Sequence, residues 1–75
     1  MIIVIHIHFV GQKILRPFNR ASSFDEMCEM LKTFIVAERM QVTDLKLHDN
    51  FGTDEPIIKA RSAVAEVEFF AFLED

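Results

Sequence analysis

Two histidines near the start of the chain and two glutamates near its end are the residues best suited to chemistry. His6 and His8 are two residues apart in an extended segment, so both side chains project to the same side, about 7 Å apart. Glu66 or Glu68 from a neighbouring strand would complete a divalent-metal site. The alternative is that the imidazoles only pair with these carboxylates on a half-wet surface. We favour the pairing, because two histidines without a cysteine or a closely spaced third ligand are not a metal motif. Pairing with a carboxylate would raise the pKa of the histidine. No cofactor is expected.

The other reactive side chains do not form a catalytic pattern. Cys28 falls on the apolar stripe of a predicted helix, which favours packing over nucleophilic work. His48 and Asp49 are adjacent, but no nucleophile lies near them in the sequence. Gly11 and Gly52 are the only glycines, so no glycine-rich loop could hold a phosphate. We therefore predict that the chain is not an enzyme.

The histidines belong to an opening segment, residues 1–10, that is apolar on nearly both sides. Its β-branched residues predict a strand in the middle of a sheet. After it, Gly11-Gln12 suits a two-residue hairpin turn. The returning strand at 13–19 must lie at an edge, because Pro17 cannot donate a hydrogen bond to a neighbouring strand.

The clearest local pattern is a helix over residues 23–40. Ser23-Phe-Asp-Glu26 is a capping-box pattern, which places acidic residues at the positive end of the helix dipole. Apolar residues then recur at helical spacing and predict one face packed on the sheet. These residues are Phe24, Met27, Cys28, Leu31, Phe34 and Ile35.

Three further segments follow the helix. A strand is expected at about 42–48, with Leu45 and Leu47 pointing inward. Residues 57–62 fit either a short edge strand or a helical turn. The last strand, 64–73, is nearly as apolar as the first. Its odd positions form one face and its even positions form the other.

The two most apolar strands, the first and the last, should be neighbours at the centre of the sheet. We expect them to run parallel, with the helix in a right-handed crossover. The fold class is therefore α+β: one domain over residues 1–75, with a mixed four- or five-stranded sheet and one helix on one face. This order of elements, ββαβ(β)β, resembles the ubiquitin-like β-grasp fold. A ferredoxin-like or other split β-α-β arrangement is the alternative.

With a single helix, one face of the sheet stays open and is the expected partner-binding surface. An apolar patch on such a face usually marks an interface. The alternative is that the segment after Pro56 folds back and covers it. The residues expected on this face to bind a partner are Val4, His6, His8, Leu15, Glu66, Glu68, Phe70 and Phe72.

Composition limits the classes of partner. The chain has 75 residues, 51% of them hydrophobic, and a formal net charge of −4. An acidic balance disfavours direct binding to nucleic acid, which needs a basic surface. The apolar start is too short to cross a bilayer and lacks the basic residues of a signal peptide, so no membrane partner is expected. A single cysteine cannot form an internal disulfide, which indicates a cytoplasmic location.

These observations favour a non-enzymatic module that binds another protein. Small acidic single domains without a catalytic cluster are typical of inhibitors that phages and mobile elements direct against host defence or nucleic-acid-processing proteins. A homodimeric structural or assembly protein and a His-based divalent-metal-binding protein are the alternatives. The acidic residues that could occupy a nucleic-acid-binding groove of a target are Asp25, Glu26, Glu29, Asp49, Asp54 and Glu55.

Overall fold

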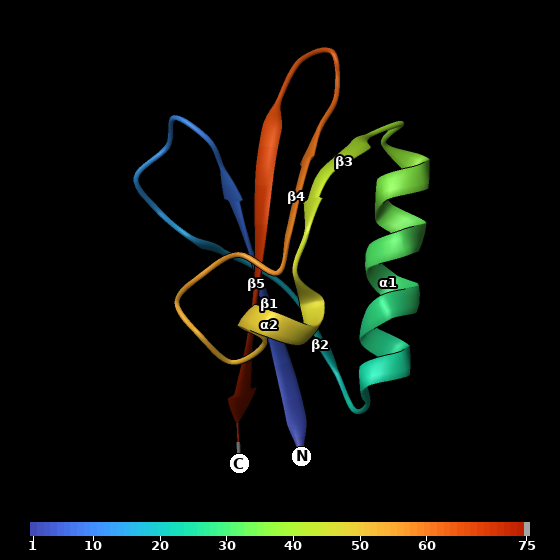
Figure 1. Cartoon of the computed structure of the whole chain (residues 1–75), viewed down its shortest axis with the longest axis vertical. Helices are drawn as coiled ribbons and strands as arrows, with labels where there is room; N and C mark the ends of the chain where they lie inside the picture. Colours follow the sequence, from blue (N-terminus) through green and yellow to red (C-terminus); the bar gives the residue numbers. More distant parts are fainter. Residues whose placement is uncertain (75) are drawn as a thin grey trace.

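One antiparallel sheet and one long helix make up the fold, in a computed structural model that describes residues 1–74. A short second helix follows the third strand (Figure 1). The elements in chain order are β1 (Ile2–Phe9), β2 (Arg16–Ala21), α1 (Phe24–Ala37), β3 (Gln41–Leu45), α2 (Leu47–Asn50), β4 (Ile58–Arg61) and β5 (Glu66–Glu74).

The strand order of the sheet is β2-β1-β5-β4-β3. The first and last strands are therefore central neighbours, as predicted. They run antiparallel, however, with Ile3 opposite Leu73 and Ile7 opposite Phe69, so the predicted parallel pair is wrong. No parallel pair occurs among the strands of residues 1–74, so the sheet is not mixed. The β-grasp layout, which we based on that parallel pair, is not confirmed, and neither is the split β-α-β alternative.

The direction of β5 depends on β4. Residues 58–61 form a full strand between β3 and β5, not the edge strand or helical turn considered above. The chain reverses direction from β3 to β4 and again from β4 to β5. Because β4 adds one reversal that the prediction lacked, β5 runs antiparallel to β1 instead of parallel to it. Ile58 and Ala60 of β4 are buried, while the alternating Lys59 and Arg61 are exposed.

The connection between β1 and β2 is longer than a two-residue turn. Gln12 donates its backbone N–H to the Phe9 carbonyl over 3.0 Å, and Gly11 has a φ of 100°, but β2 begins only at Arg16. A bulge interrupts the β1–β2 pairing, since Ile5 lies opposite Asn19 and His6 opposite Pro17. β2 is an edge strand, as Pro17 predicted.

The main helix begins where the capping box predicts. The Ser23 hydroxyl accepts a hydrogen bond from the Glu26 backbone N–H over 3.1 Å. At the other end, the Met40 N–H bonds the Ile35 carbonyl around Arg39, which has a φ of 53°. This left-handed turn ends the helix before the predicted residue 40.

The core lies between α1 and the odd-numbered side chains of β1 and β5. Phe18 of β2, Phe34 of α1 and Phe69 of β5 meet edge to face, with ring centroids 4.9–5.8 Å apart. This geometry suits the aromatic quadrupole. The buried members of the core are Ile3, Ile5, Ile7, Ala21, Met27, Leu31, Ile57, Ile58, Ala60, Val67, Phe69 and Ala71.

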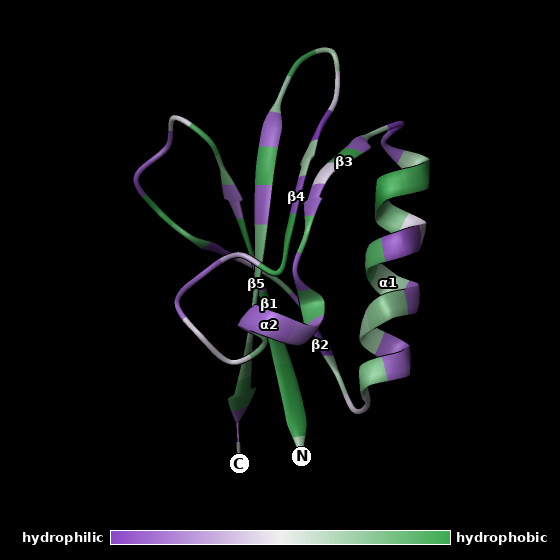
Figure 2. Cartoon of the chain, in the orientation of Figure 1, coloured by the Kyte–Doolittle hydropathy of each residue, from purple (hydrophilic) through white to green (hydrophobic). Residues whose placement is uncertain are grey.

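The third strand is shorter than predicted, and its inward residue is not covered. A bulge between Val42 and Asp44 shifts the pairing with β4, and Leu45, opposite the buried Ile58, lies on the helix side of the sheet but is 60% exposed. Leu47 does pack against the core, but from α2 rather than from a strand. Figure 2 shows α2 as hydrophilic except at the end that carries Leu47. Among residues 1–74, no helix is long and apolar enough to cross a membrane.

Candidate partner-binding surface

The predicted binding residues of β1 and β5 lie together on the face of the sheet away from α1. The strand register places His8 opposite Glu68, His6 opposite Phe70 and Val4 opposite Phe72. Side chains alternate along a strand, so these even-numbered residues face away from the core. Two loops, residues 10–15 and 52–56, lie on this side of β1 and β5, with α1 on the other (Figure 1).

The two loops enclose a hollow of about 450 Å³ on this face. Leu15 and Lys13 come from one loop, Asp54 comes from the other, and Phe70 and Phe72 provide the apolar part. We call this site the β1–β5 hollow; its lining residues are His8, Lys13, Leu15, Asp54, Glu68, Phe70 and Phe72.

Phe70 is not exposed, contrary to the prediction of a bare apolar patch. It is only 9% exposed, whereas Phe72 is half-buried. Cover reaches this face from residues 10–15 and from the loop before Pro56, not from the segment after it. Local periodicity contains no information about such loop placement, so the sequence could not predict it.

His8 forms the predicted pair with Glu68. Its Nδ1 lies 2.9 Å from Glu68 Oε1, and its Nε2 lies 2.5 Å from the carbonyl oxygen of Gln12. The pKa of His8 is raised above its ordinary value of 6.5. The largest cause is the hydrogen bond with Glu68, followed by the hydrogen bond with the Gln12 carbonyl. Desolvation opposes this rise.

His6 lies in a different environment from His8. Its ring packs edge-on against Phe72, with centroids 5.5 Å apart and an interplanar angle of 86°. The Nδ1 atom of His6 is buried without a hydrogen-bond partner among the described residues. Within residues 1–74, no three His, Cys, Asp or Glu side chains lie close enough to hold a metal ion. The arrangement therefore does not support the metal alternative.

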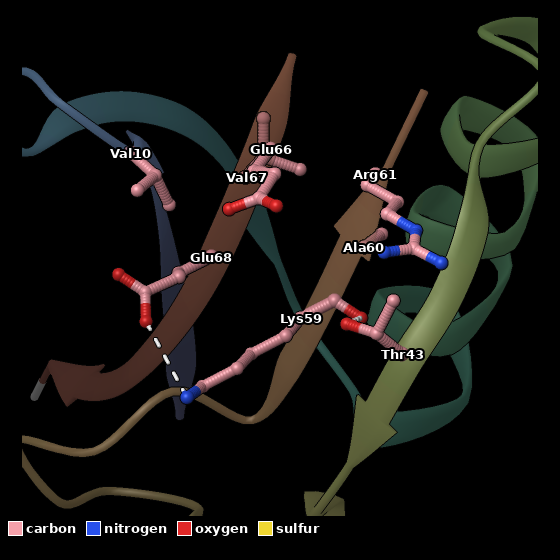
Figure 3. Close-up of a pocket in the computed structure, with 8 residues that line it drawn as sticks. All are labelled: Val10, Thr43, Lys59, Ala60, Arg61, Glu66, Val67 and Glu68. Atoms are coloured by element: carbon pink, nitrogen blue, oxygen red, sulfur yellow. Dashed lines mark hydrogen bonds and ion pairs between the residues drawn. The ribbon is translucent and has the colours of Figure 1, made fainter. Parts of the chain in front are cut away.

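A second, charged hollow of about 320 Å³ adjoins the first on the same sheet face (Figure 3). Lys59 reaches from β4 toward Glu68, with Nζ 3.9 Å from Oε2. Glu68 thus faces both His8 and Lys59, and it connects the two hollows. Glu66 also lines the charged hollow, whereas Arg61 extends toward Thr43 of β3 (Figure 3).

Lys59 and Arg61 were missed in the sequence analysis. The alternation of apolar and basic residues in Ile58-Lys-Ala-Arg61 is the pattern that could have found them, since it is typical of a strand with one wet face.

The structure divides the six predicted acidic residues between separate places. Asp25, Glu26 and Glu29 lie in the first turns of α1, where Glu26 also accepts a hydrogen bond from the Ser22 hydroxyl over 2.8 Å. Asp49 lies in α2, which contacts the start of α1 because the Phe24 ring stacks on His48. Asp54 lines the β1–β5 hollow on the opposite face. Glu55 lies beside another depression, which is lined also by Asp44, Lys46 and Lys59.

An apolar groove of about 310 Å³ separates α1 from β3 and β4. It forms because α1 packs mainly against β1 and β2, so the helix lies less closely over β3 and β4 at the other end of the sheet. Val36 at its rim is 69% exposed. Cys28 also lines the groove, and burial, followed by Asp25 and Glu29, raises the pKa of its thiol. A protonated thiol is a poor nucleophile, in agreement with a packing role.

Comparisons with protein families, with curated proteins and with solved structures give no match to this chain.

Proposed function

We propose that this chain is a non-enzymatic module that binds another protein through the β1–β5 hollow. The observation that carries the proposal is an apolar floor, Phe70 and Phe72, surrounded by the charged side chains of His8, Lys13, Asp54 and Glu68. Protein interfaces commonly combine a dry apolar centre with a polar rim.

Binding would proceed by insertion of an apolar anchor side chain of the partner between the two loops. Leu15 and Phe72 are the contacts left partly accessible, since Phe70 is already buried. The charges at the rim would select the orientation of the partner through complementary pairs.

The inhibitor version of this proposal uses the acidic start of α1. Asp25 and Glu29 are exposed there and would face a basic, nucleic-acid-binding groove on the target. Such binding weakens steeply with salt. The test compares the dissociation constant at about 50 mM and about 500 mM salt. An unchanged value would exclude binding through the acidic start of α1 and leave the β1–β5 hollow as the binding surface.

The decisive experiment is affinity capture from a lysate of the source organism, followed by calorimetry with the purified partner. Phe72→Asp places a carboxylate on the floor of the hollow and should weaken binding at least about tenfold. Val64→Asp is the matched control, because Val64 is 93% exposed and lies outside the hollow. Equal losses in both variants, or full binding by Phe72→Asp, would refute the assignment of this surface.

Self-association is the second candidate, and the apolar groove beside β3 favours it. β3 is an edge strand with a free side, and its Val42 lines the groove. Two copies could bury these grooves against each other. Sedimentation velocity at micromolar concentration should then give a dimer that Val42→Lys converts to a monomer. A wild-type monomer would eliminate this candidate.

A further inference from the structure

The ring of His8 lies between two groups that can only accept hydrogen bonds from it. One is the carboxylate of Glu68 and the other is the backbone carbonyl of Gln12, at 2.9 and 2.5 Å. A neutral imidazole has one N–H and one lone pair, whereas an imidazolium has two N–H donors. Only protonated His8 can therefore donate to both partners at once.

The two partners differ in how firmly they are held. Glu68 is paired with His8 in the β1–β5 ladder, at the centre of the sheet. Gln12 belongs to the loop of residues 10–15, in which every residue is exposed; the backbone N–H groups of Val10 and Gln12 bond the carbonyls of Glu66 and Phe9. When His8 loses its proton, one lone pair must face an acceptor oxygen, and the contact to the loop is the one that can open.

The charged groups around His8 come from several elements. Glu68 on β5 favours the imidazolium. Asp54 on the 52–56 loop and Lys13 on the 10–15 loop line the same hollow, and Lys59 on β4 has its Nζ 3.9 Å from Glu68. His6 lies on the same face of β1, two residues away, and Glu66 lies two residues from Glu68 on β5.

We propose that protonated His8 is a latch that ties the loop of residues 10–15 to β5 and so fixes one wall of the β1–β5 hollow. Lys13 and Leu15 form that wall. Release of the loop at higher pH widens the hollow and exposes its phenylalanine floor. The latch regulates the site of the proposed function, on which its purpose rests, but it operates in the free chain without a partner.

The test is an NMR pH titration of the whole chain that follows the ring nitrogens of all three histidines and the backbone amides of the loop. The His8 midpoint should lie above 6.5. The Gly11, Gln12 and Lys13 amides should shift with that same midpoint. A gadolinium chelate in solution should broaden the Phe70 and Phe72 ring signals more strongly above this midpoint than below it.

Two variants separate the latch from general effects of pH. Glu68→Gln should move the His8 midpoint and the loop midpoint to lower pH together, because it removes the carboxylate. His8→Gln should abolish the pH response of the loop amides, whereas His48→Gln, on α2, should leave it unchanged.

The latch would be overturned if the loop amides of the wild type do not shift at the His8 midpoint. It would also be overturned if the loop amides of His8→Gln still shift over the same pH range. The titration uses no partner, so its outcome is independent of the capture experiment that tests the proposed function.

Discussion

Truncating Phe70 tests whether loops cover the outer face of the sheet, because the free energy of unfolding should change much more if Phe70 is buried than if it is exposed. If that face were bare, truncating Phe70 would remove little buried surface. In the structure Phe70 is 9% exposed, beneath the loops that carry Leu15 and Asp54. Phe→Ala substitutions at buried sites cost about 3–5 kcal/mol, through lost transfer energy and the cavity left behind. We expect about 3 kcal/mol for Phe70→Ala, because the adjoining hollow and exposed loops allow partial collapse.

That loss is large for a domain of this size. At about 0.05–0.15 kcal/mol per residue, the 75 residues provide about 4–11 kcal/mol of total stability. With a urea dependence of about 1 kcal/mol per molar, the unfolding midpoint should fall by about 3 M. Equilibrium urea unfolding followed by far-UV circular dichroism measures this shift.

Phe72→Ala is the matched control on the same strand and face. Phe72 is half-buried and packs on the His6 ring, so its truncation should cost about 1 kcal/mol. If Phe70→Ala destabilises the domain no more than Phe72→Ala does, the loops do not cover this face and the description of the β1–β5 hollow is wrong.

Four further substitutions test the helix caps and the His8 pair. Ser23→Ala should lower the free energy of unfolding by about 1 kcal/mol through loss of the N-cap bond; an unchanged urea midpoint would contradict this role. Arg39→Gly should raise stability by about 0.5 kcal/mol, since relief at a φ of 53° outweighs the entropy of glycine, whereas Glu38→Gly at −89° should lower it. The raised pKa of His8 means that its contribution to stability is complete below pH 6.5 and is lost as the pH rises through the folded-state pKa. Unfolding midpoints measured between pH 5 and 9, a range chosen to bracket that pKa, should therefore decline less in His8→Gln than in the wild type.

Apolarity alone predicted which strands are central. Residues 1–10 and 64–73 read as strands buried on both faces, and their even positions were assigned correctly to the face away from the helix. Capping chemistry likewise located the start of α1 to the residue. These are local properties that a few neighbouring side chains determine.

The predictions were wrong where a feature depends on parts of the chain that are distant in sequence. The strand at 58–61 is only four residues long, yet it reverses the direction of β5. Leu45 lies opposite the buried Ile58, so it is on the predicted face of the sheet, but it stays exposed because α1 packs mainly against β1 and β2. The covering of Phe70 depends on where two loops lie in space, which no pattern within either loop specifies.

Pairing of the first strand with the last has a consequence for synthesis on the ribosome. Ile2 lies opposite Glu74, so the middle of the sheet joins residues that are far apart in the sequence and are translated at different times. Ile3, Ile5 and Ile7 stay without their β5 partners until that strand has left the exit tunnel. Contacts of such long sequence separation slow folding. Until β5 has emerged, β1 can pair only with β2, so the edge of β1 that β5 later occupies stays open to aggregation.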